Sequence, residues 1–194
     1  MTAAASPRLE PGRVYRTRDF STWSANPTRL AQRLVRDHKV VKLAHGIFAA
    51  PEQSRFGPKP PSDEALMRAF LGTSRFLFTG PEKWNALGLG ATAMFATALV
   101  YTGDKRTGTF QLGSRRYTLR RVAFPKSPPA EWFVVDLFEN AERAGVSRDV
   151  LTQGLSRALA RRGFRVTVLR DMAVEYGTKA TQDHIEDAIR GAKP

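Results

Sequence analysis

The sequence predicts an α+β fold in which an N-terminal winged helix-turn-helix precedes a small α+β domain with a helical C-terminal tail. The first observation is an arginine-rich amphipathic pattern over residues 27–37, followed at once by a short glycine-containing hairpin pattern over residues 40–49. The second is a series of short β-rich runs within residues 76–122, followed by helical patterns within residues 131–190. Strands grouped ahead of helices are typical of the α+β class.

A proline-rich segment divides the two predicted domains. The stretch PEQSRFGPKPPS, which begins at Pro51, holds four prolines in twelve residues, and such a composition favours an extended linker. We therefore assign residues 1–57 to the winged helix-turn-helix and residues 58–194 to the α+β domain.

The composition indicates a basic globular protein. The 194 residues carry a formal net charge of +13, and the sequence pI is about 10.8. Residues 1–60 hold eleven Lys and Arg against four Asp and Glu, and residues 105–126 hold seven Lys and Arg and no acid. A polyanion is the natural partner of such charge, although excess charge also serves solubility.

Several classes of protein are disfavoured. The absence of cysteine removes disulfides and thiolate chemistry. No apolar run approaches the roughly 18 residues of a membrane span, and MTAAASPRLEPGR lacks the apolar core of a signal peptide. We expect a cytoplasmic protein with no membrane partner.

The first domain is predicted element by element. GRVYRTRDFS favours a short strand and a short helix opening at Thr17. Asn26 is a good N-cap and Pro27 suits the first helical position, so a helix should follow. Its apolar positions share one face that should pack on Phe20, Trp23 and the hairpin, and Gly46 supplies the hairpin turn.

The second domain is predicted from its turn residues and periodicity. TGPE at residues 79–82 fits a capping box with Thr79 as N-cap and Glu82 reaching back, so a short helix should end near Gly88. FRVTV, at residues 164–168, is open to either helix or strand. The other predicted helices are 64–71, 131–144, 147–162, 168–176 and 181–190, and the predicted strands are 75–79, 98–102, 107–112 and 116–122.

A strand, a short helix, a basic helix and a hairpin form most of a winged helix-turn-helix, whose second helix enters the major groove of DNA. In the 27–37 helix Thr28 and Gln32 point away from the apolar face, while Arg29, Arg33 and Arg36 can approach phosphates or guanine edges. Basic side chains continue along the wing at Lys39, Lys42 and His45. The alternative is a merely solvated helix face.

A second basic patch falls on the last predicted strand and the residue before it, at Arg115, Arg116, Arg120 and Arg121. Arg116 and Arg120 share one strand face, and the other two flank Tyr117 on the opposite face. The patch could extend a DNA footprint, bind RNA or an acidic partner, or protect an edge strand from aggregation.

No motif supports catalysis. GLGATA at 88–93 fits a dinucleotide pattern but follows a capped helix rather than a strand, and GLSRA at 154–158 places Ser156 inside a helix. GSRR at 113–116 lacks the paired acids of a nucleotidyltransferase, and DHIED at 183–187 has no second ligand cluster for a metal. We expect a protein that is not an enzyme and needs no cofactor or metal.

The order of these blocks resembles the AbiEi-type antitoxins of type IV toxin–antitoxin systems. The similar blocks are GRVYRTRDF, RLVRDHKVVKL, HGIFAAP, FLFTGPEKWNALGL, ALVYTGD and RRYTLRRV, which cover roughly residues 12–125. The resemblance implies a bacterial repressor that binds inverted repeats in its own promoter and counteracts a nucleotidyltransferase-like toxin. It places DNA contacts at Thr28, Arg29, Gln32, Arg33, Arg36, Lys42 and His45.

One departure and two alternatives accompany this resemblance. Relatives usually have a longer helix ahead of GRV, whereas Pro7 and Pro11 leave only a few residues for it here. The runner-up function is a nucleic-acid recognition subunit for a nuclease supplied in trans. A third is an RNA-binding protein that uses the 105–126 cluster.

Overall fold

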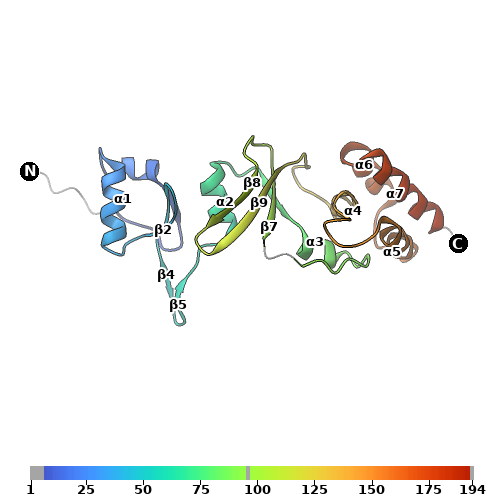
Figure 1. The fold of residues 1–194 in the computed structure, drawn as a ribbon, viewed down its shortest axis with the longest axis horizontal. Coiled ribbons are helices and arrows are strands. Elements are labelled where there is room, and N and C mark those ends of the chain that lie inside the picture. Colours follow the sequence, from blue (N-terminus) through green and yellow to red (C-terminus); the bar gives the residue numbers. More distant parts are fainter. Residues whose placement is uncertain (1–6, 95–96, 193–194) are drawn as a thin grey trace, which may run out of the picture. The chain divides into compact units, whose positions relative to one another are not determined.

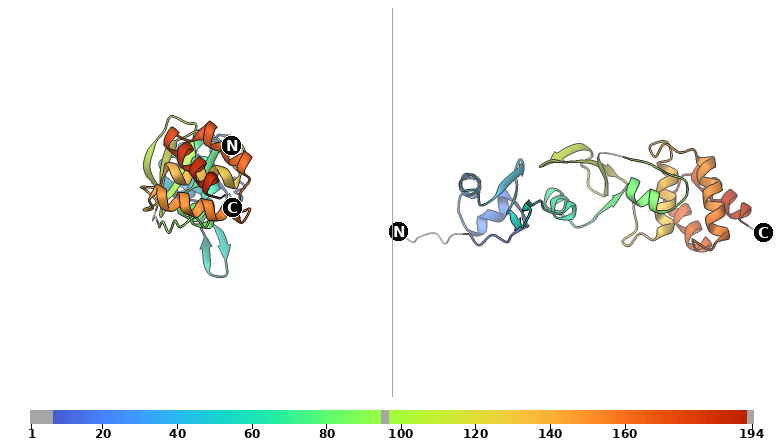
Figure 2. Two further views of the ribbon diagram at one scale, coloured as in Figure 1. Left: turned by 90° about the vertical axis from the view of Figure 1, so that its right-hand side faces the viewer. Right: turned by 90° about the horizontal axis from the view of Figure 1, so that it is seen from below.

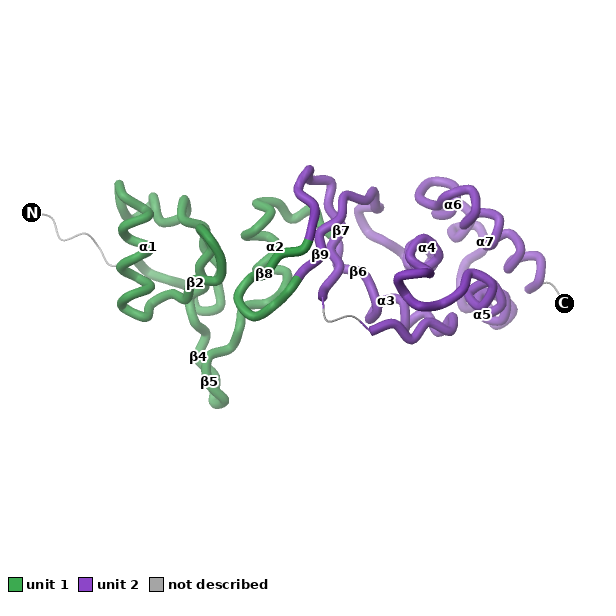
Figure 3. Tube along the Cα trace, in the orientation of Figure 1, with its two compact units in different colours: residues 1–76, 109–116 green, residues 77–108, 117–194 purple. Residues whose placement is uncertain are grey.

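A computed structural model of the chain describes residues 7–94 and 97–192, and it confirms a mixed α+β protein (Figure 1). The chain forms two compact units (Figure 3). The first unit comprises residues up to 76 together with 109–116, and the second comprises 77–108 together with the residues from 117 onward. The predicted boundary at residue 57 thus lies within the first unit, and the termini 1–6 and 193–194 lie outside the described residues.

The first unit begins with the predicted order of a strand, a short helix, a longer helix and a hairpin. The elements are β1 (Val14–Arg16), the 3₁₀ helix η1 (Thr17–Thr22), α1 (Pro27–Arg36), β2 (Val41–Ala44) and β3 (Ile47–Ala49). The three strands form an antiparallel sheet in the order β1-β3-β2, so β3 is the central strand.

The sequence of α1 explains its start and its orientation on the sheet. The Asn26 side chain accepts a hydrogen bond from the Arg29 amide at 3.0 Å, which satisfies one of the amides that a helix start leaves unpaired. Leu30 and Leu34 are buried in a core that includes Phe20 and Phe48, whose ring centroids are 5.6 Å apart. Burial stabilises the fold by roughly 1.5–3 kcal/mol for each side chain of this size.

The segment predicted as an extended linker is a hairpin of β4 (Glu52–Ser54) and β5 (Gly57–Lys59), so the linker prediction was wrong. The hairpin projects from the first unit in each view where it is seen side-on (Figures 1 and 2). Ser54 closes the turn, since its hydroxyl donates to the Gly57 carbonyl at 2.7 Å and accepts from the Phe56 amide at 3.2 Å. Pro58 is tolerated because a two-stranded ribbon has only edge strands.

The first unit is completed by α2 (Asp63–Leu71), which packs against β1, and by the 109–116 tip of a later hairpin. Phe70 stacks on Phe110 with ring centroids 4.2 Å apart, and Arg115 pairs with Asp63 at 2.6 Å. Residues 7–13 contain no helix, and both η1 and α2 contact β1.

The predicted strands of the second half form one sheet. Its strands are β6 (Phe76–Thr79), β7 (Ala98–Thr102), β8 (Gly108–Leu112) and β9 (Arg115–Arg121), in the order β6-β7-β9-β8 with β7 and β9 parallel. The short helix α3 (Pro81–Ala86) follows β6.

The capping box predicted for α3 was wrong. The N-cap is Gly80, with φ of 108°, and no side chain caps the helix. The Thr79 hydroxyl instead donates to the carboxylate of Asp136. A buried carboxylate is the stronger acceptor, and it draws the threonine away from the helix start.

The helices predicted as a tail are part of the second unit's core. They are α4 (Ala130–Glu139), α5 (Arg148–Ala160), α6 (Val166–Tyr176) and α7 (Lys179–Gly191). Buried residues of all four join Trp84, Leu99 and Tyr101 in a single cluster. The alternative of a strand at FRVTV was wrong because α6 begins at Val166. Among the described residues, no helix has both the length and the apolar character needed to cross a membrane.

Candidate nucleic-acid interface

One face of α1 presents a row of polar and basic side chains to solvent. Arg29, Gln32 and Arg36 follow each other at spacings of three and four residues, which places them on one side of a helix, with Thr28 beside Gln32. All four are exposed, whereas Leu30, Ala31 and Leu34 on the opposite side are buried. The helix is therefore held by its apolar side and leaves its cationic side accessible.

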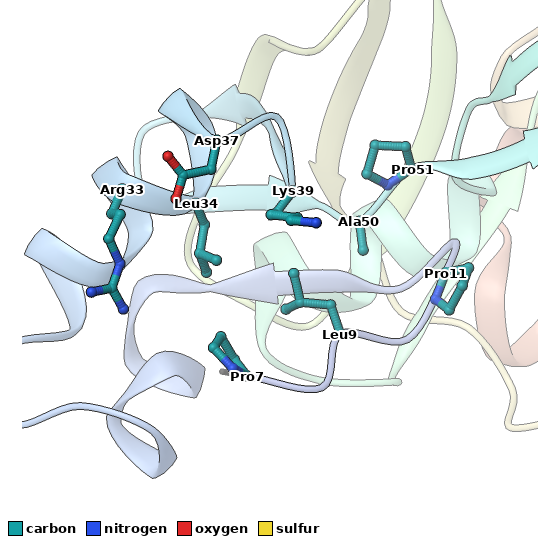
Figure 4. A pocket seen from close by; sticks show the side chains of 9 residues that line it. All are labelled: Pro7, Leu9, Pro11, Arg33, Leu34, Asp37, Lys39, Ala50 and Pro51. Atoms are coloured by element: carbon teal, nitrogen blue, oxygen red, sulfur yellow. The ribbon is translucent and has the colours of Figure 1, made fainter. Parts of the chain in front are cut away.

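Arg33 is exposed as predicted, but it lies at the edge of this face rather than in its centre. It lines a hollow of about 620 Å³ beside the N-terminal segment (Figure 4). The hollow is lined by Pro7, Leu9, Pro11, Arg33, Leu34, Asp37, Lys39, Ala50 and Pro51. Arg33 and Lys39 thus share their surroundings with the carboxylate of Asp37, which weakens their attraction for an anion.

The β2–β3 hairpin carries the other predicted contacts. Lys42 is exposed on the edge strand β2, opposite the buried Phe48 of β3, and His45 is exposed in the turn. Gly46 has a φ of 70°, a backbone conformation that residues with a Cβ atom rarely adopt. The Gly46 carbonyl accepts a hydrogen bond from the Thr17 amide at 3.0 Å, so the turn is fixed against the start of η1.

The cations of this surface form no ion pairs among the described residues. Among the described residues, no carboxylate lies within 4.0 Å of the charged nitrogens of Arg29, Arg33, Arg36, Lys39 or Lys42. Unpaired cations on one helix and the neighbouring hairpin create a positive field, which attracts polyanions and raises their rate of association.

The second basic patch is not a set of equivalent side chains. Arg115 and Arg116 belong to the first unit and Arg120 and Arg121 to the second. Arg115 pairs with Asp63 at 2.6 Å, and Arg120 donates to the Asn140 side-chain oxygen at 2.9 Å. Arg116 and Arg121 are exposed. Two of the four arginines are therefore engaged in holding the fold.

A buried polar cluster surrounds Asp136 in the second unit, and it was not predicted from the sequence. Four donors converge on the carboxylate: the hydroxyl of Thr79, the indole of Trp84 at 2.8 Å, the hydroxyl of Tyr101 at 2.7 Å and the side-chain amide of Asn140 at 3.1 Å. Burial raises the pKa of Asp136 despite these donors, and burial together with the adjacent carboxylate raises the pKa of Tyr101.

The Asp136 cluster joins β6, α3, β7 and α4, and Arg120 on β9 reaches it through Asn140. No spacing in the sequence could have revealed it, because the partners lie 4 to 57 residues from Asp136. Both carboxylate oxygens already accept hydrogen bonds, so the group is poorly placed to act as a base on a bound substrate.

A second carboxylate in the second unit, that of Glu131, is hydrogen-bonded to Arg165. Glu131 accepts from the Arg165 backbone amide and Nε at 3.0 Å and from its Nη2 at 3.1 Å. These bonds hold the pKa of Glu131 at about 2. The pair fixes the start of α4 to the residue that precedes α6.

Three of the sequence motifs that resemble catalytic or metal-binding sites lie within helices or at a helix end. Gly88, with φ of 68°, follows the end of α3, and Ser156 lies inside α5. The DHIED acids lie on α7, and the described residues contain no group of three or more His, Cys, Asp or Glu side chains able to hold a metal.

Comparison with known protein families finds no match for this chain, and no curated protein matches it.

Proposed function

We propose that the chain is a DNA-binding transcriptional regulator whose first unit is a winged helix-turn-helix. In this proposal η1 and α1 are the two helices of the motif, and β2–β3 is the wing. Arg29, Gln32 and Arg36 of α1 enter the major groove, while Lys42 and His45 contact the flanking backbone or minor groove.

The observation that carries the proposal is the division of α1 into a buried apolar side and a solvent-facing row of Arg29, Gln32 and Arg36. Arginine donates two parallel hydrogen bonds to guanine and glutamine does so to adenine, so the row has the chemistry of base readout. A merely solvated helix needs charge, but it does not need its arginines to lack ion pairs with carboxylates of the described chain.

The target and partner follow from the resemblance of the sequence to AbiEi-type antitoxins. We propose that the protein represses its own promoter by binding inverted repeats, and that it counteracts a nucleotidyltransferase-like toxin. The alternative of an RNA-binding protein built on the 105–126 cluster is less favoured, since Arg115 and Arg120 already have partners within their own units.

Footprinting of the full chain on its own upstream DNA tests the proposal. We expect protection of a short site that contains an inverted repeat, with affinity that falls steeply as salt rises. The Arg29→Ala/Arg36→Ala double variant should lose most of the specific protection and keep the thermal stability of the wild type. If this variant protects the same site as the wild type, α1 does not contact the DNA.

A matched control separates base readout from net charge. Arg143→Ala/Arg148→Ala also removes two exposed arginines, but from the second unit. It should leave the protected site unchanged. Equal losses for the two double variants would mean that the binding is non-specific attraction of a basic protein to DNA.

A further inference from the structure

A second cationic surface lies in the first unit, away from the exposed row of α1. An open hollow of about 770 Å³ lies between the β1–η1 segment and α2. Four arginines line it, namely Arg13, Arg16, Arg18 and Arg68, and the acid in its lining is Asp19. The charged side chains of the lining therefore sum to +3.

Two of these arginines have partners, and two do not. Arg13 pairs with Glu10 at 2.6 Å, and Arg18 lies 4.0 Å from Asp19. Within the described chain, no carboxylate lies within 4.0 Å of the charged nitrogens of Arg16 or Arg68. Guanidinium groups that converge without enough acid repel each other, and a bound anion relieves that repulsion.

The backbone leaves room for this arrangement at Gly72, which ends α2 with φ of 73°. A Cβ atom at this position would collide with the Arg16 guanidinium. Glycine therefore lets Arg16 approach the carboxyl end of α2, where the helix dipole favours a cation. Arg68, in the last turn of α2, lines the same hollow.

The hollow begins next to the proposed wing. Arg16 and Arg18 flank Thr17, whose amide donates to the carbonyl of Gly46 in the hairpin turn. A duplex that lies along α1 and the wing would continue past this turn, and its backbone presents phosphates at regular intervals. The guanidinium fork of arginine is matched to phosphate oxygens.

We propose that the arginine hollow, defined by Arg13, Arg16, Arg18 and Arg68, holds phosphodiester groups of the DNA that flanks the site contacted by α1. The inference rests on the proposed DNA-binding function and adds to it a second, sequence-independent contact. Contacts of this kind fix register and affinity without reading bases. They make the footprint longer than α1 and the wing alone would cover.

Arg68→Gln is the variant of choice for the test. Glutamine keeps much of the side-chain length and the helix propensity, and removes the charge and the fork. Arg16 is less suitable because its guanidinium packs beside Gly72. The control is Arg75→Gln, which removes the same charge from an exposed position of the first unit outside the hollow.

The experiment measures binding of the full-length protein to two duplexes as salt is varied. One duplex carries about ten flanking base pairs on each side, a full helical turn of DNA, and the other is trimmed to the base pairs that the Arg68→Gln protein itself protects. On the long duplex, Arg68→Gln should bind about three- to tenfold more weakly, with a salt slope smaller in magnitude by about 0.9. On the trimmed duplex it should equal the wild type, and Arg75→Gln should equal the wild type on both.

The other outcomes separate this inference from the function on which it rests. If Arg68→Gln and the wild type bind both duplexes equally, the hollow does not hold phosphates, while a loss with Arg29→Ala/Arg36→Ala would still support α1 as the reading helix. If Arg68→Gln weakens binding and the α1 variants do not, the hollow is a DNA contact and the proposal for α1 is wrong. If the wild type binds neither duplex, both proposals are wrong.

Discussion

In the first unit, Arg29, Gln32 and Arg36 of α1 face solvent, and the two arginines form no ion pair among the described residues. In the second unit, Asp136 is buried and accepts hydrogen bonds from four donors. Buried polar groups are costly unless they are paired, so the partners of Asp136 come from within the chain. Exposed cations carry no such requirement, and their partners can come from outside. The comparison separates polar residues that maintain the fold from those available for binding.

The largest effect should come from Asp136→Ala. The substitution leaves the buried donors of Trp84 and Tyr101 without their acceptor, and each such group costs about 1–3 kcal/mol. We expect the free energy of unfolding to fall by about 3–5 kcal/mol, because the removal of one partner from a buried charged network leaves the rest uncompensated. Denaturant unfolding followed by circular dichroism measures it.

The control for this variant is Asp171→Ala, which removes an exposed acid on α6. It should change the free energy of unfolding by no more than about 0.5 kcal/mol. If Asp136→Ala is equally mild, the cluster does not hold the second unit together, and the contrast between the two units loses its basis.

The opposite pattern is expected for Gln32→Ala. Alanine suits a helix, and the Gln32 side chain is exposed, so the free energy of unfolding should stay within about 0.5 kcal/mol of the wild type. Specific DNA binding should weaken by about 1–3 kcal/mol, with a relaxed preference at one base pair. Fluorescence anisotropy on a set of single-base-pair variants of the operator measures both.

Gln153→Ala, on the exposed side of α5, is the matched control. It makes the same change on a helix of the second unit and should bind DNA as the wild type does. Reduced affinity in both variants, or in neither, would contradict an assignment of base readout to α1.

The features that could be predicted from the sequence are those that depend on interactions between residues close together in the chain. The positions of α1 and the β2–β3 hairpin could be predicted because Asn26, Pro27, the spacing of Leu30 and Leu34, and Gly46 act within a few residues. The exposure of the candidate contacts followed from the same periodicity.

Features that depend on distant residues were not predictable. Thr79 looked like an N-cap because its local sequence fits one, but Asp136, 57 residues away, takes its hydroxyl. The prolines around β4 and β5 indicated a linker, although their positions on edge strands are compatible with a hairpin. Arg16 and Arg68 were not candidates, because only the packing of α2 against β1 brings them to one hollow.

The Glu131–Arg165 pair gives a smaller and pH-dependent effect. The folded-state pKa of Glu131 is about 2, below its ordinary value of 4.5, so the pair stabilises the fold fully above pH 4.5 and loses this contribution as pH falls toward 2. Glu131→Gln should lower the free energy of unfolding by about 1–2 kcal/mol at neutral pH, since the Arg165 side chain is 68% exposed and screened by solvent.

The measurement compares the wild type and Glu131→Gln by denaturant unfolding at a series of pH values. The difference between them should be constant near neutrality and shrink below pH 4.5. A difference that persists unchanged to pH 2.5 would show that the pair contributes through packing rather than through charge. The DNA affinity of Glu131→Gln should equal that of the wild type, as expected for a residue that maintains the fold and does not bind DNA.

The smallest effect is expected for Lys42→Ala on β2, the edge strand of the β2–β3 hairpin. If Lys42 contacts a phosphate, its removal should weaken binding to all duplexes about equally, by up to about 1 kcal/mol, and reduce the magnitude of the salt slope by about 0.9. Sequence preference should not change, which distinguishes this variant from Gln32→Ala.

The control is Lys83→Ala, which removes an exposed lysine from α3 of the second unit and should leave the salt slope unchanged. If Lys42→Ala keeps the wild-type slope while Gln32→Ala lowers specific affinity, then α1 reads the DNA without help from this strand. The hairpin would then act only as a support for α1, through the core that Phe48 shares with Leu30 and Leu34.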